Sequence, residues 1–403
     1  MTIPKRRSPL SPNTVLSFEN TEIAFAAKSD RELNRAYLLF KAIGIKPLVI
    51  LGPPFIDLSL KLRLPIKGLI RSTIFAHFCG GETIEDCEAT INHLHKFNIG
   101  TILDYSVEGK ETEKDFENCV NETIATIKRA KGDKAIPFTV FKVTGLASFS
   151  LLEKVNTGMF LSEYEAKEWL KVIDRVDRIC KAANQANVPV FIDAEESWIQ
   201  KAIDGLAEDM MKKYNSNKAI VYNTVQMYRT DRLSYLRHHT IIAKEKGFKT
   251  GIKLVRGAYM EKERRRAERS DYPSPIQPNK AACDRDYNQA LRLCIDNRDY
   301  VSLCSGTHNE ESSLLLVKLM KEAGMAPSDE RVCFSQLLGM SDHISYNLAS
   351  NGYNVAKYVP YGPVTAVLPY LFRRAAENTS IAGQTSRELT LLEKERKRRR
   401  SKK

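Results

Sequence analysis

The chain has 403 residues, 43% of them hydrophobic and 28% charged, and these proportions exclude a mostly disordered, collagen-like or membrane-spanning chain. The formal net charge is +13, of which residues 394–403 contribute +7 through eight basic and one acidic side chains. The rest of the chain is only mildly basic, which does not indicate a duplex-binding domain. We expect residues 386–403 to be a disordered basic tail, with attraction to anionic lipid as the alternative.

The eight cysteines form no CxxC motif and no tight cluster with histidine. This distribution argues against structural zinc and predicts reduced thiols in a cytosol-like compartment. We find no run of about 18 apolar residues and no secretory signal, so neither a spanning helix nor secretion is expected.

The first segment, residues 1–75, is expected to be a helical arm, because residues 30–43 carry a helical pattern. From residue 99 onward, short apolar runs rich in β-branched residues alternate with amphipathic helical stretches. Eight such runs occur, at residues 99–107, 136–146, 188–196, 219–228, 251–259, 301–309, 331–340 and 354–362. Eight strand–helix repeats predict an α/β protein with a (β/α)8 barrel of the TIM type over residues 76–385. A doubly wound open sheet is the alternative, although no GxGxxG motif is present.

Polar residues stand at the C-terminal ends of these runs, which meet at one mouth of a parallel barrel. The mouth is therefore predicted to hold an active site lined by Lys142, Asp193, Glu195, Gln226, Arg256, Tyr259, Thr307, His308 and Tyr358.

The segment PYLFRRAAEN, residues 369–378, follows the eighth run. On a helix, Tyr370, Arg373 and Glu377 share one face and Arg374 lies next to it. Two adjacent guanidinium groups suit a carboxylate or phosphate, whereas a solvated charged face is the alternative interpretation.

Two further motifs contain residue types that can bind a metal ion or cap a helix. The IDAEE segment at 192–196 could bind a metal or cap a helix, and it places Asp193 and Glu195 on one face with Lys142 as an ion-pair partner for Asp193. His308 has no second histidine at ligand spacing, so no metal site is predicted.

Several motifs together resemble the proline dehydrogenase family, and more specifically its eukaryote-like monofunctional branch. They are FKVTGL, FIDAEE, VQMYR, KLVRGAY, THN, QLLGM and KYVPYGPVTAVLPYLFRRAAEN, in family order across all eight runs. The resemblance implies a distorted (β/α)8 barrel that binds FAD across its mouth without a Rossmann fingerprint.

The resemblance also implies roles for individual residues. The flavin-binding residues would be Ala194, Gln226, Arg256, Gly257, Ala258, Thr307 and His308. The substrate pocket would be formed by Lys142, Asp193, Tyr259, Leu337, Tyr358, Tyr370, Arg373 and Arg374, with Glu377 supporting the arginines. Lys142, Asp193 and Lys253 would be catalytic. Lys253 stands where many bacterial members have arginine, and a lysine is a point charge near flavin N5 instead of a planar fork.

The implied reaction is the oxidation of L-proline to 1-pyrroline-5-carboxylate, the first step of proline catabolism, with hydride passing from C5 to flavin N5 and electrons then to a quinone. Implied partners are the quinone, a peripheral membrane contact and, transiently, 1-pyrroline-5-carboxylate dehydrogenase, with no nucleic acid. The expected location is cytoplasmic, with peripheral contact at the inner membrane, or mitochondrial for a eukaryotic source. Two alternatives remain: a hydroxyproline dehydrogenase of the same superfamily, and an inactive barrel that binds lipid or nucleic acid.

Overall fold

The computed structural model describes residues 16–45, 56, 62, 66–106, 111–380 and 384–402, with the backbone alone at 375–380 and 384–386. The chain forms two compact units. We call Thr101–Ser335 the central unit, and Met1–Gly100 together with Gln336–Lys403 the terminal unit.

The eight strands follow the order β1 to β8 of a closed barrel, and the paired strands of the central unit are parallel. Each predicted run overlaps one strand: β1 (Ile99–Tyr105), β2 (Phe138–Lys142), β3 (Val190–Asp193), β4 (Val221–Gln226), β5 (Thr250–Val255), β6 (Val301–Gly306), β7 (Val332–Leu337) and β8 (Val355–Tyr361). The (β/α)8 prediction is therefore confirmed, and the closed strand order excludes the doubly wound alternative.

Aromatic side chains fill the space between the early strands. The rings of Phe138 and Phe191 stack with centroids 4.6 Å apart, and Tyr222 meets the Phe191 ring edge-on at 5.3 Å. All three residues are buried. Such layers make a barrel interior a packed core, which leaves the strand ends as the place for chemistry.

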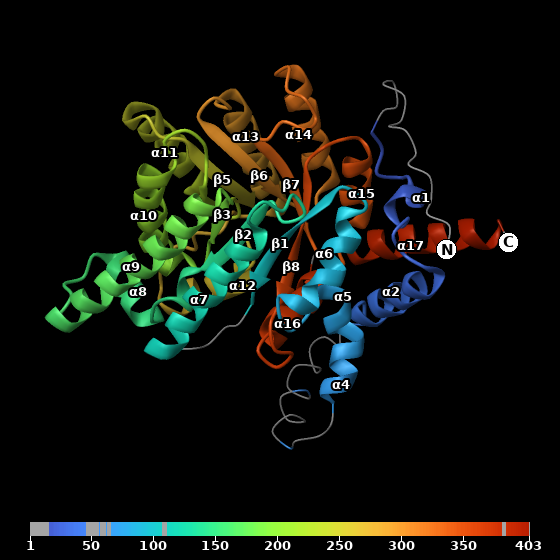
Figure 1. The fold of residues 1–403 in the computed structure, drawn as a ribbon, viewed down its shortest axis with the longest axis horizontal. Coiled ribbons are helices and arrows are strands. Elements are labelled where there is room, and N and C mark those ends of the chain that lie inside the picture. Colours follow the sequence, from blue (N-terminus) through green and yellow to red (C-terminus); the bar gives the residue numbers. More distant parts are fainter. Residues whose placement is uncertain are drawn as a thin grey trace. The chain divides into compact units, whose positions relative to one another are not determined.

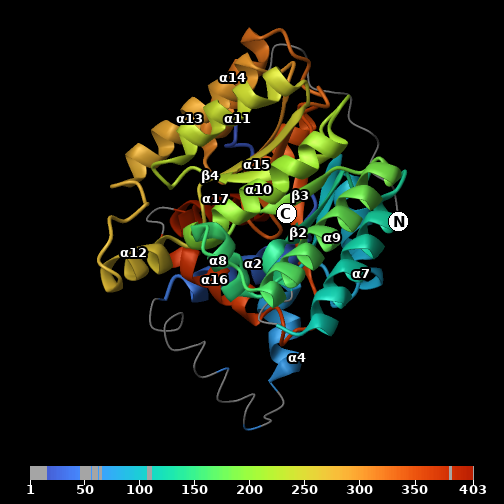
Figure 2. The same ribbon diagram turned by 90° about the vertical axis from the view of Figure 1, so that its left-hand side faces the viewer.

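Amphipathic helices cover the strands of the central unit (Figures 1 and 2). Four of the eight α-helices, α7, α9, α13 and α14, have side-chain N-caps; for example, Ser162 and Glu165 form a capping box, and Asn279 accepts a hydrogen bond from the backbone N–H of Ala282. The helices are α7 (Glu113–Ala130), α8 (Phe149–Thr157), α9 (Glu163–Ala186), α10 (Ser197–Tyr214), α11 (Arg232–Lys246), α12 (Met260–Arg269), α13 (Lys280–Asp296) and α14 (Glu310–Glu322), together with the 3-10 turn η3 (Val143–Gly145).

The terminal unit is mainly helical and contains β8. Its second helix begins at Asp30 and ends at Ile43, as the pattern at 30–43 predicts. The described elements are α1 (Thr21–Ala24), α2 (Asp30–Ile43), α4 (Lys67–Ile70), the π-helical turn η1 (Arg71–Phe75), α5 (Ala76–Phe78), η2 (Glu85–Cys87), α6 (Glu88–His95), α15 (Asp342–Ser350), α16 (Leu368–Ser380) and α17 (Gln384–Arg400). Among the described residues, no helix is both long and apolar enough to cross a membrane.

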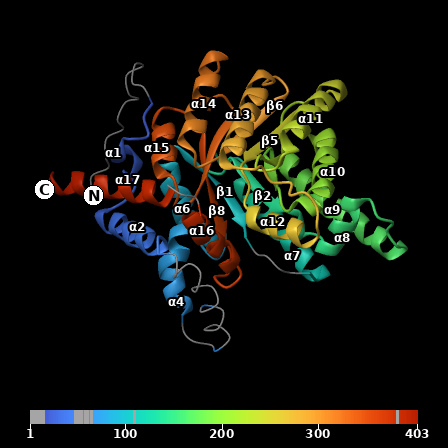
Figure 3. The ribbon, with the colours of Figure 1, turned by 180° about the vertical axis from the view of Figure 1, so that it is seen from behind.

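The C-terminal segment differs from the expected disordered tail. Residues 384–400 form α17, which lies beside α1 and α2 (Figure 3), and Leu391 and Leu392 are buried against apolar side chains of the N-terminal helices. The run of charged residues suggested a solvated chain, but Leu391 and Leu392 form a short apolar stripe on this helix. The physical reason for the difference is that burying this stripe favours a packed helix over a solvated chain.

Candidate active site

Several sequence-predicted residues of the central unit stand at the C-terminal ends of neighbouring strands. Lys142 ends β2, Asp193 ends β3 and Gln226 ends β4, whereas Arg256 and Thr307 directly follow β5 and β6. Because the strands are parallel, these ends open at the same mouth. The polar groups are thus gathered where a barrel enzyme carries its active site.

Two lysine–carboxylate pairs lie among these strand ends. Lys253 of β5 donates a hydrogen bond to Asp193, and both side chains are largely buried. Lys142 Nζ lies 3.5 Å from the Asp104 carboxylate, which also accepts a hydrogen bond from Ser106. Burial raises the pKa of Asp104 above its ordinary value, although Lys142 opposes this. We call these four residues, with two positive and two negative groups, the strand-end cluster.

The sequence interpretation made Lys142 an ion-pair partner of Asp193, and this pairing stays a prediction. The two residues are neighbours in the β2–β3 register, and they also form ion pairs with Asp104 and Lys253 respectively. Sequence reasoning missed Asp104, although its position near the end of the first apolar run was a usable signal.

Glu195 supports Gln226 from the next strand. The Gln226 side-chain amide donates to the backbone carbonyl of Glu195 at 2.6 Å, and the Glu195 carboxylate accepts from the backbone N–H and hydroxyl of Thr144 at 3.1 and 2.6 Å. The Glu195 N–H donates to Gln200 at 2.8 Å. Burial raises the pKa of Glu195 to about 7. The IDAEE segment therefore holds the Gln226 side chain in place through the hydrogen-bonded backbone of Glu195.

Arg256 has a fixed guanidinium group. It donates to Asp284 at 2.7 Å, to the Thr307 hydroxyl at 2.6 Å and to Ser312 at 3.0 Å, and it lies 4.4 Å from the centroid of the Tyr287 ring. These contacts orient the guanidinium without covering it, because 22% of the side chain remains exposed.

The next residue, Gly257, has φ +133°, and a Cβ there would lie 2.5 Å from the Tyr228 ring. Only glycine fits this position. The Gly257 and Ala258 backbone is exposed, so a planar ligand could approach it closely.

Three other predicted residues of the central unit flank these strand ends. Ala194 follows β3 and is 9% exposed, His308 follows Thr307 after β6, and Tyr259 directly precedes α12. His308 and Tyr259 are half-buried.

The terminal unit carries the predicted arginine pair on α16. Tyr370 and Arg374 are 5% and 8% exposed, and the Arg374 guanidinium lies 5.1 Å from the centroid of the Tyr370 ring. Arg373 is half-buried beside them. The side chain of Glu377 lies outside the described residues, so its support of the arginines stays a prediction.

The apolar residues predicted to line the pocket also belong to the terminal unit. Leu337, at the end of β7, packs against a buried cluster that contains Met340 and Tyr370. Tyr358 lies in the middle of β8 and is half-buried. Leu337 and Tyr370 therefore share one apolar cluster, although they come from distant parts of the sequence.

A closed eight-stranded parallel barrel with ion-paired lysines at its strand ends defines the class of (β/α)8 barrel enzymes. Residues 87–387 match the family model described as proline dehydrogenase. The chain belongs to the proline dehydrogenase family, which places it among the oxidoreductases.

Two relatives and one solved structure illustrate the similarity. Proline dehydrogenase 1, mitochondrial, from Dictyostelium discoideum is 33% identical, over 96% of this chain and 76% of the relative. Hydroxyproline dehydrogenase from Xenopus laevis is 32% identical, over 95% and 90%. The crystal structure of proline utilization A from Bdellovibrio bacteriovorus, inactivated by N-propargylglycine, has a TM-score of 0.70 at 18% identity. The match covers 92% of this chain and 40% of that one, and at this identity it supports the fold alone.

Proposed function

We propose that the chain is an FAD-dependent L-proline dehydrogenase that produces 1-pyrroline-5-carboxylate. The observation that carries the proposal is the adjacent pair Arg373 and Arg374 on α16, with Arg374 buried against Tyr370, in a member of this family. Two adjacent guanidinium groups suit a carboxylate, because their planar forks can donate charge-assisted hydrogen bonds to its oxygens. An amino-acid substrate carries such a group.

The residues of the central unit fit a flavin. Gly257 leaves exposed backbone that no side chain shields, and Gln226, Arg256 and Thr307 offer polar groups held by their own hydrogen bonds. Ala194, Ala258 and His308 complete the proposed flavin-binding set at the same strand ends. Bound FAD would supply the hydride acceptor.

The protein's own contribution would be binding and charge placement. Arg373 and Arg374 would hold the proline carboxylate, while Leu337, Tyr259, Tyr358 and Tyr370 would surround the ring. In the strand-end cluster, each lysine ammonium rests on a carboxylate, so Lys142, Asp193 and Lys253 would present fixed charges to the reacting amine. L-Proline would lose a hydride from C5 and a proton from nitrogen.

The deciding experiment is spectroscopic. Purified protein should show the absorption of oxidised flavin, and anaerobic addition of L-proline should bleach it. A colourless preparation that also fails to bind added FAD would contradict the proposal.

The arginine pair can be tested separately. Arg373→Met or Arg374→Met should lower kcat/KM for L-proline, because a charge-assisted contact to the carboxylate is lost. The expected decrease corresponds to about 2–4 kcal/mol in activation free energy. Flavin content should stay close to that of the parent protein. Near-normal proline kinetics in either variant would remove that arginine from the proposed carboxylate site.

A second candidate is hydroxyproline dehydrogenase, and the Xenopus laevis relative of that name favours it. We expect proline to be preferred, because the bulk of Tyr358 should crowd the ring's C4. Tyr358→Ser should then shift the ratio of kcat/KM toward 4-hydroxyproline. Equal kcat/KM for both substrates in the unchanged protein would contradict this preference.

The proposed electron acceptor is a quinone, and the proposed transient partner is 1-pyrroline-5-carboxylate dehydrogenase. Relatives named as mitochondrial support that location for a eukaryotic source. A membrane contact through α17 would depend on its exposed side chains, such as Lys397 and Arg400, because Arg398 and Arg399 form ion pairs with carboxylates of the protein.

A further inference from the structure

The segment that follows β7, residues 338–341, has a strained backbone. Gly339 adopts φ +76°, and Ser341 adopts φ +51° although it is not a glycine. A side chain in this left-handed region raises the energy of the chain, and the conformation persists only when surrounding contacts hold it. The contacts that hold this segment are therefore of functional interest.

Three elements of the terminal unit, α5, β8 and α17, hold the segment through four polar contacts. The Leu338 N–H donates to the Tyr358 carbonyl at 2.9 Å, and the His77 ring nitrogen Nε2 lies 2.9 Å from the Gly339 carbonyl oxygen. Lys357 Nζ donates to the Met340 carbonyl. The Ser341 N–H donates to the carboxylate of Glu388. The last contact comes from α17, the helix that the sequence interpretation treated as a tail.

Glu388 is only 3% exposed, and burial raises its pKa. Its carboxylate also lies 4.0 Å from Nδ1 of His343. A buried carboxylate without hydrogen bonds is unfavourable, so the Ser341 N–H and Glu388 stabilise each other. The contact gives the Glu388 carboxylate a hydrogen-bond donor and holds Ser341 in its left-handed conformation.

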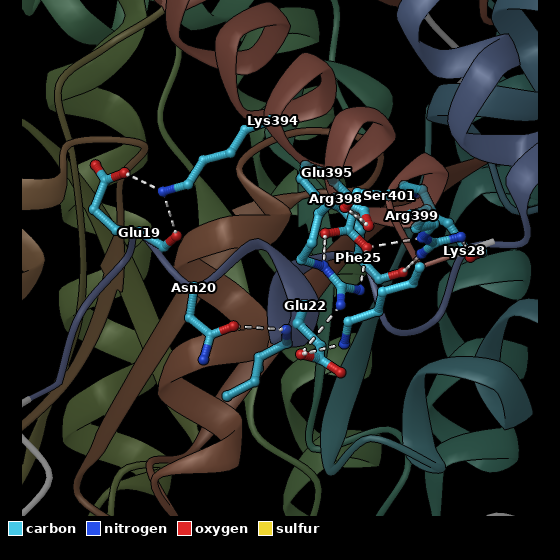
Figure 4. Close-up of polar contacts among 12 residues, drawn as sticks. Glu19, Asn20, Glu22, Phe25, Lys28, Lys394, Glu395, Arg398, Arg399 and Ser401 are labelled. Atoms are coloured by element: carbon cyan, nitrogen blue, oxygen red, sulfur yellow. Dashed lines mark hydrogen bonds and ion pairs between the residues drawn. The ribbon is translucent and has the colours of Figure 1, made fainter.

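The remainder of α17 fixes the position of Glu388. Leu391 and Leu392 pack against Phe25, Leu33 and Phe40. In Figure 4, Arg398 and Arg399 bind Glu395 of the same helix. They also contact Glu22 of α1 and, in the connection between α1 and α2, the carbonyls of Phe25 and Lys28. These contacts prevent the helix from sliding, so Glu388 is presented at a defined place.

The segment also contains the residues that connect it to the proposed substrate pocket. Met340 is buried in the cluster with Tyr370, and Leu337 packs against that cluster. A shift at Ser341 would therefore be transmitted to Leu337 and to the Tyr370 side of α16.

We propose that Glu388 is a positioning residue for the substrate pocket, which holds the Leu337–Ser341 segment in place from the C-terminal helix. The inference rests on the proposed function for the identity of the substrate. Its effect on the pocket would be indirect, through the hydrogen bond to the backbone N–H of Ser341.

The kinetic test compares Glu388→Ala, Glu388→Gln and the control Glu393→Ala, which changes an exposed glutamate on the same helix. Glu388→Ala should raise KM for L-proline about tenfold while kcat and flavin content change less than about twofold. Glu388→Gln keeps an acceptor for the Ser341 N–H and should restore most of the affinity. An unchanged KM in Glu388→Ala, or equal loss of kcat and flavin content without a change in KM, would overturn the proposal.

A second measurement does not depend on the activity. Hydrogen–deuterium exchange of a peptide covering residues 337–343 should be faster in Glu388→Ala than in the Glu393→Ala control, and close to the parent rate in Glu388→Gln. Unchanged exchange would overturn the role of Glu388 even in an inactive protein. Conversely, wild-type protein that neither binds flavin nor oxidises proline would overturn the proposed function alone.

Discussion

Two buried lysine–carboxylate clusters in this protein use the same chemistry in different surroundings. The strand-end cluster joins Lys142 to Asp104 and Lys253 to Asp193, with two charges of each sign. The second cluster belongs to the terminal unit, where Asp342 lies 3.0 Å from Lys28 and 2.9 Å from Lys357. We call it the interior cluster. In it, a single aspartate serves two lysines.

The difference lies in what surrounds each aspartate. Burial disfavours the charge of Asp342, but Lys28 and Lys357 outweigh this effect and hold its pKa well below the ordinary value. Burial also raises the pKa of Asp104, and there the opposing effect of Lys142 does not reverse it. Both ion pairs of the interior cluster therefore share the carboxylate of Asp342, whereas each lysine of the strand-end cluster has an ion pair with a different carboxylate. We expect the interior cluster to matter for stability and the strand-end cluster to matter for catalysis.

The largest expected effect is that of Asp342→Asn. This substitution removes the carboxylate that contacts both the buried Lys357 and the half-buried Lys28, and it should lower the free energy of unfolding by about 3–5 kcal/mol, measured by denaturant titration. Asp299→Asn is the control, because the Asp299 side chain is 82% exposed and its loss should change stability by less than about 1 kcal/mol. Equal stability of Asp342→Asn and the parent would abolish the distinction between the clusters.

A substitution in the strand-end cluster should lower activity more than it lowers stability. Lys253→Met removes the ammonium group that Asp193 binds, and should lower kcat with L-proline by about 100-fold because a preorganised charge is lost. Stability should fall less than in Asp342→Asn, since Lys142 lies beside Asp193 in the strand register. A Lys253→Met protein with parental kcat would show that this pair is structural as well.

The two clusters also differ in how far the sequence could predict them. Lys142 and Asp193 end their strands, and such positions can be read from the sequence because a parallel strand is buried on both faces and its polar residues come at its end. Asp104 and Lys253 lie inside their strands, so the same rule did not identify them. Lys28, Asp342 and Lys357 are brought together from distant parts of the chain, and no local pattern marks a charge that will be buried. Chain folding decides such a contact, and a single sequence does not reveal it.

The same limit explains the C-terminal helix. Glu388, Leu391, Leu392 and Glu395 have the spacing of one helical face, so the signal for α17 was present. The basic residues around it suggested a solvated tail, because their carboxylate partners Glu22 and Asp30 lie near the other end of the chain. Composition could not indicate that these charges would be paired.

The smallest expected effect concerns the pH dependence of stability. As the pH rises, the contribution of Glu195 to the free energy of unfolding should change in the opposite direction to that of Asp342. The pKa of Glu195 rises from 4.5 to about 7 on folding, so the folded state holds the proton more tightly. Its stabilising contribution is complete below about pH 4.5 and is lost as the pH rises through about 7. Asp342, with a lowered pKa, instead loses its contribution as the pH falls below the ordinary range of an aspartate.

In Glu195→Gln the titrating group is absent, while its amide can still accept from the Thr144 N–H. The free energy of unfolding should therefore decline less between pH 4.5 and 7 in the variant than in the parent, by on the order of 1–3 kcal/mol. Denaturant titrations of both proteins at several pH values measure this difference. Parallel pH profiles would mean that Glu195 titrates normally, and that the hydrogen bonds from Thr144 hold its carboxylate charged despite burial.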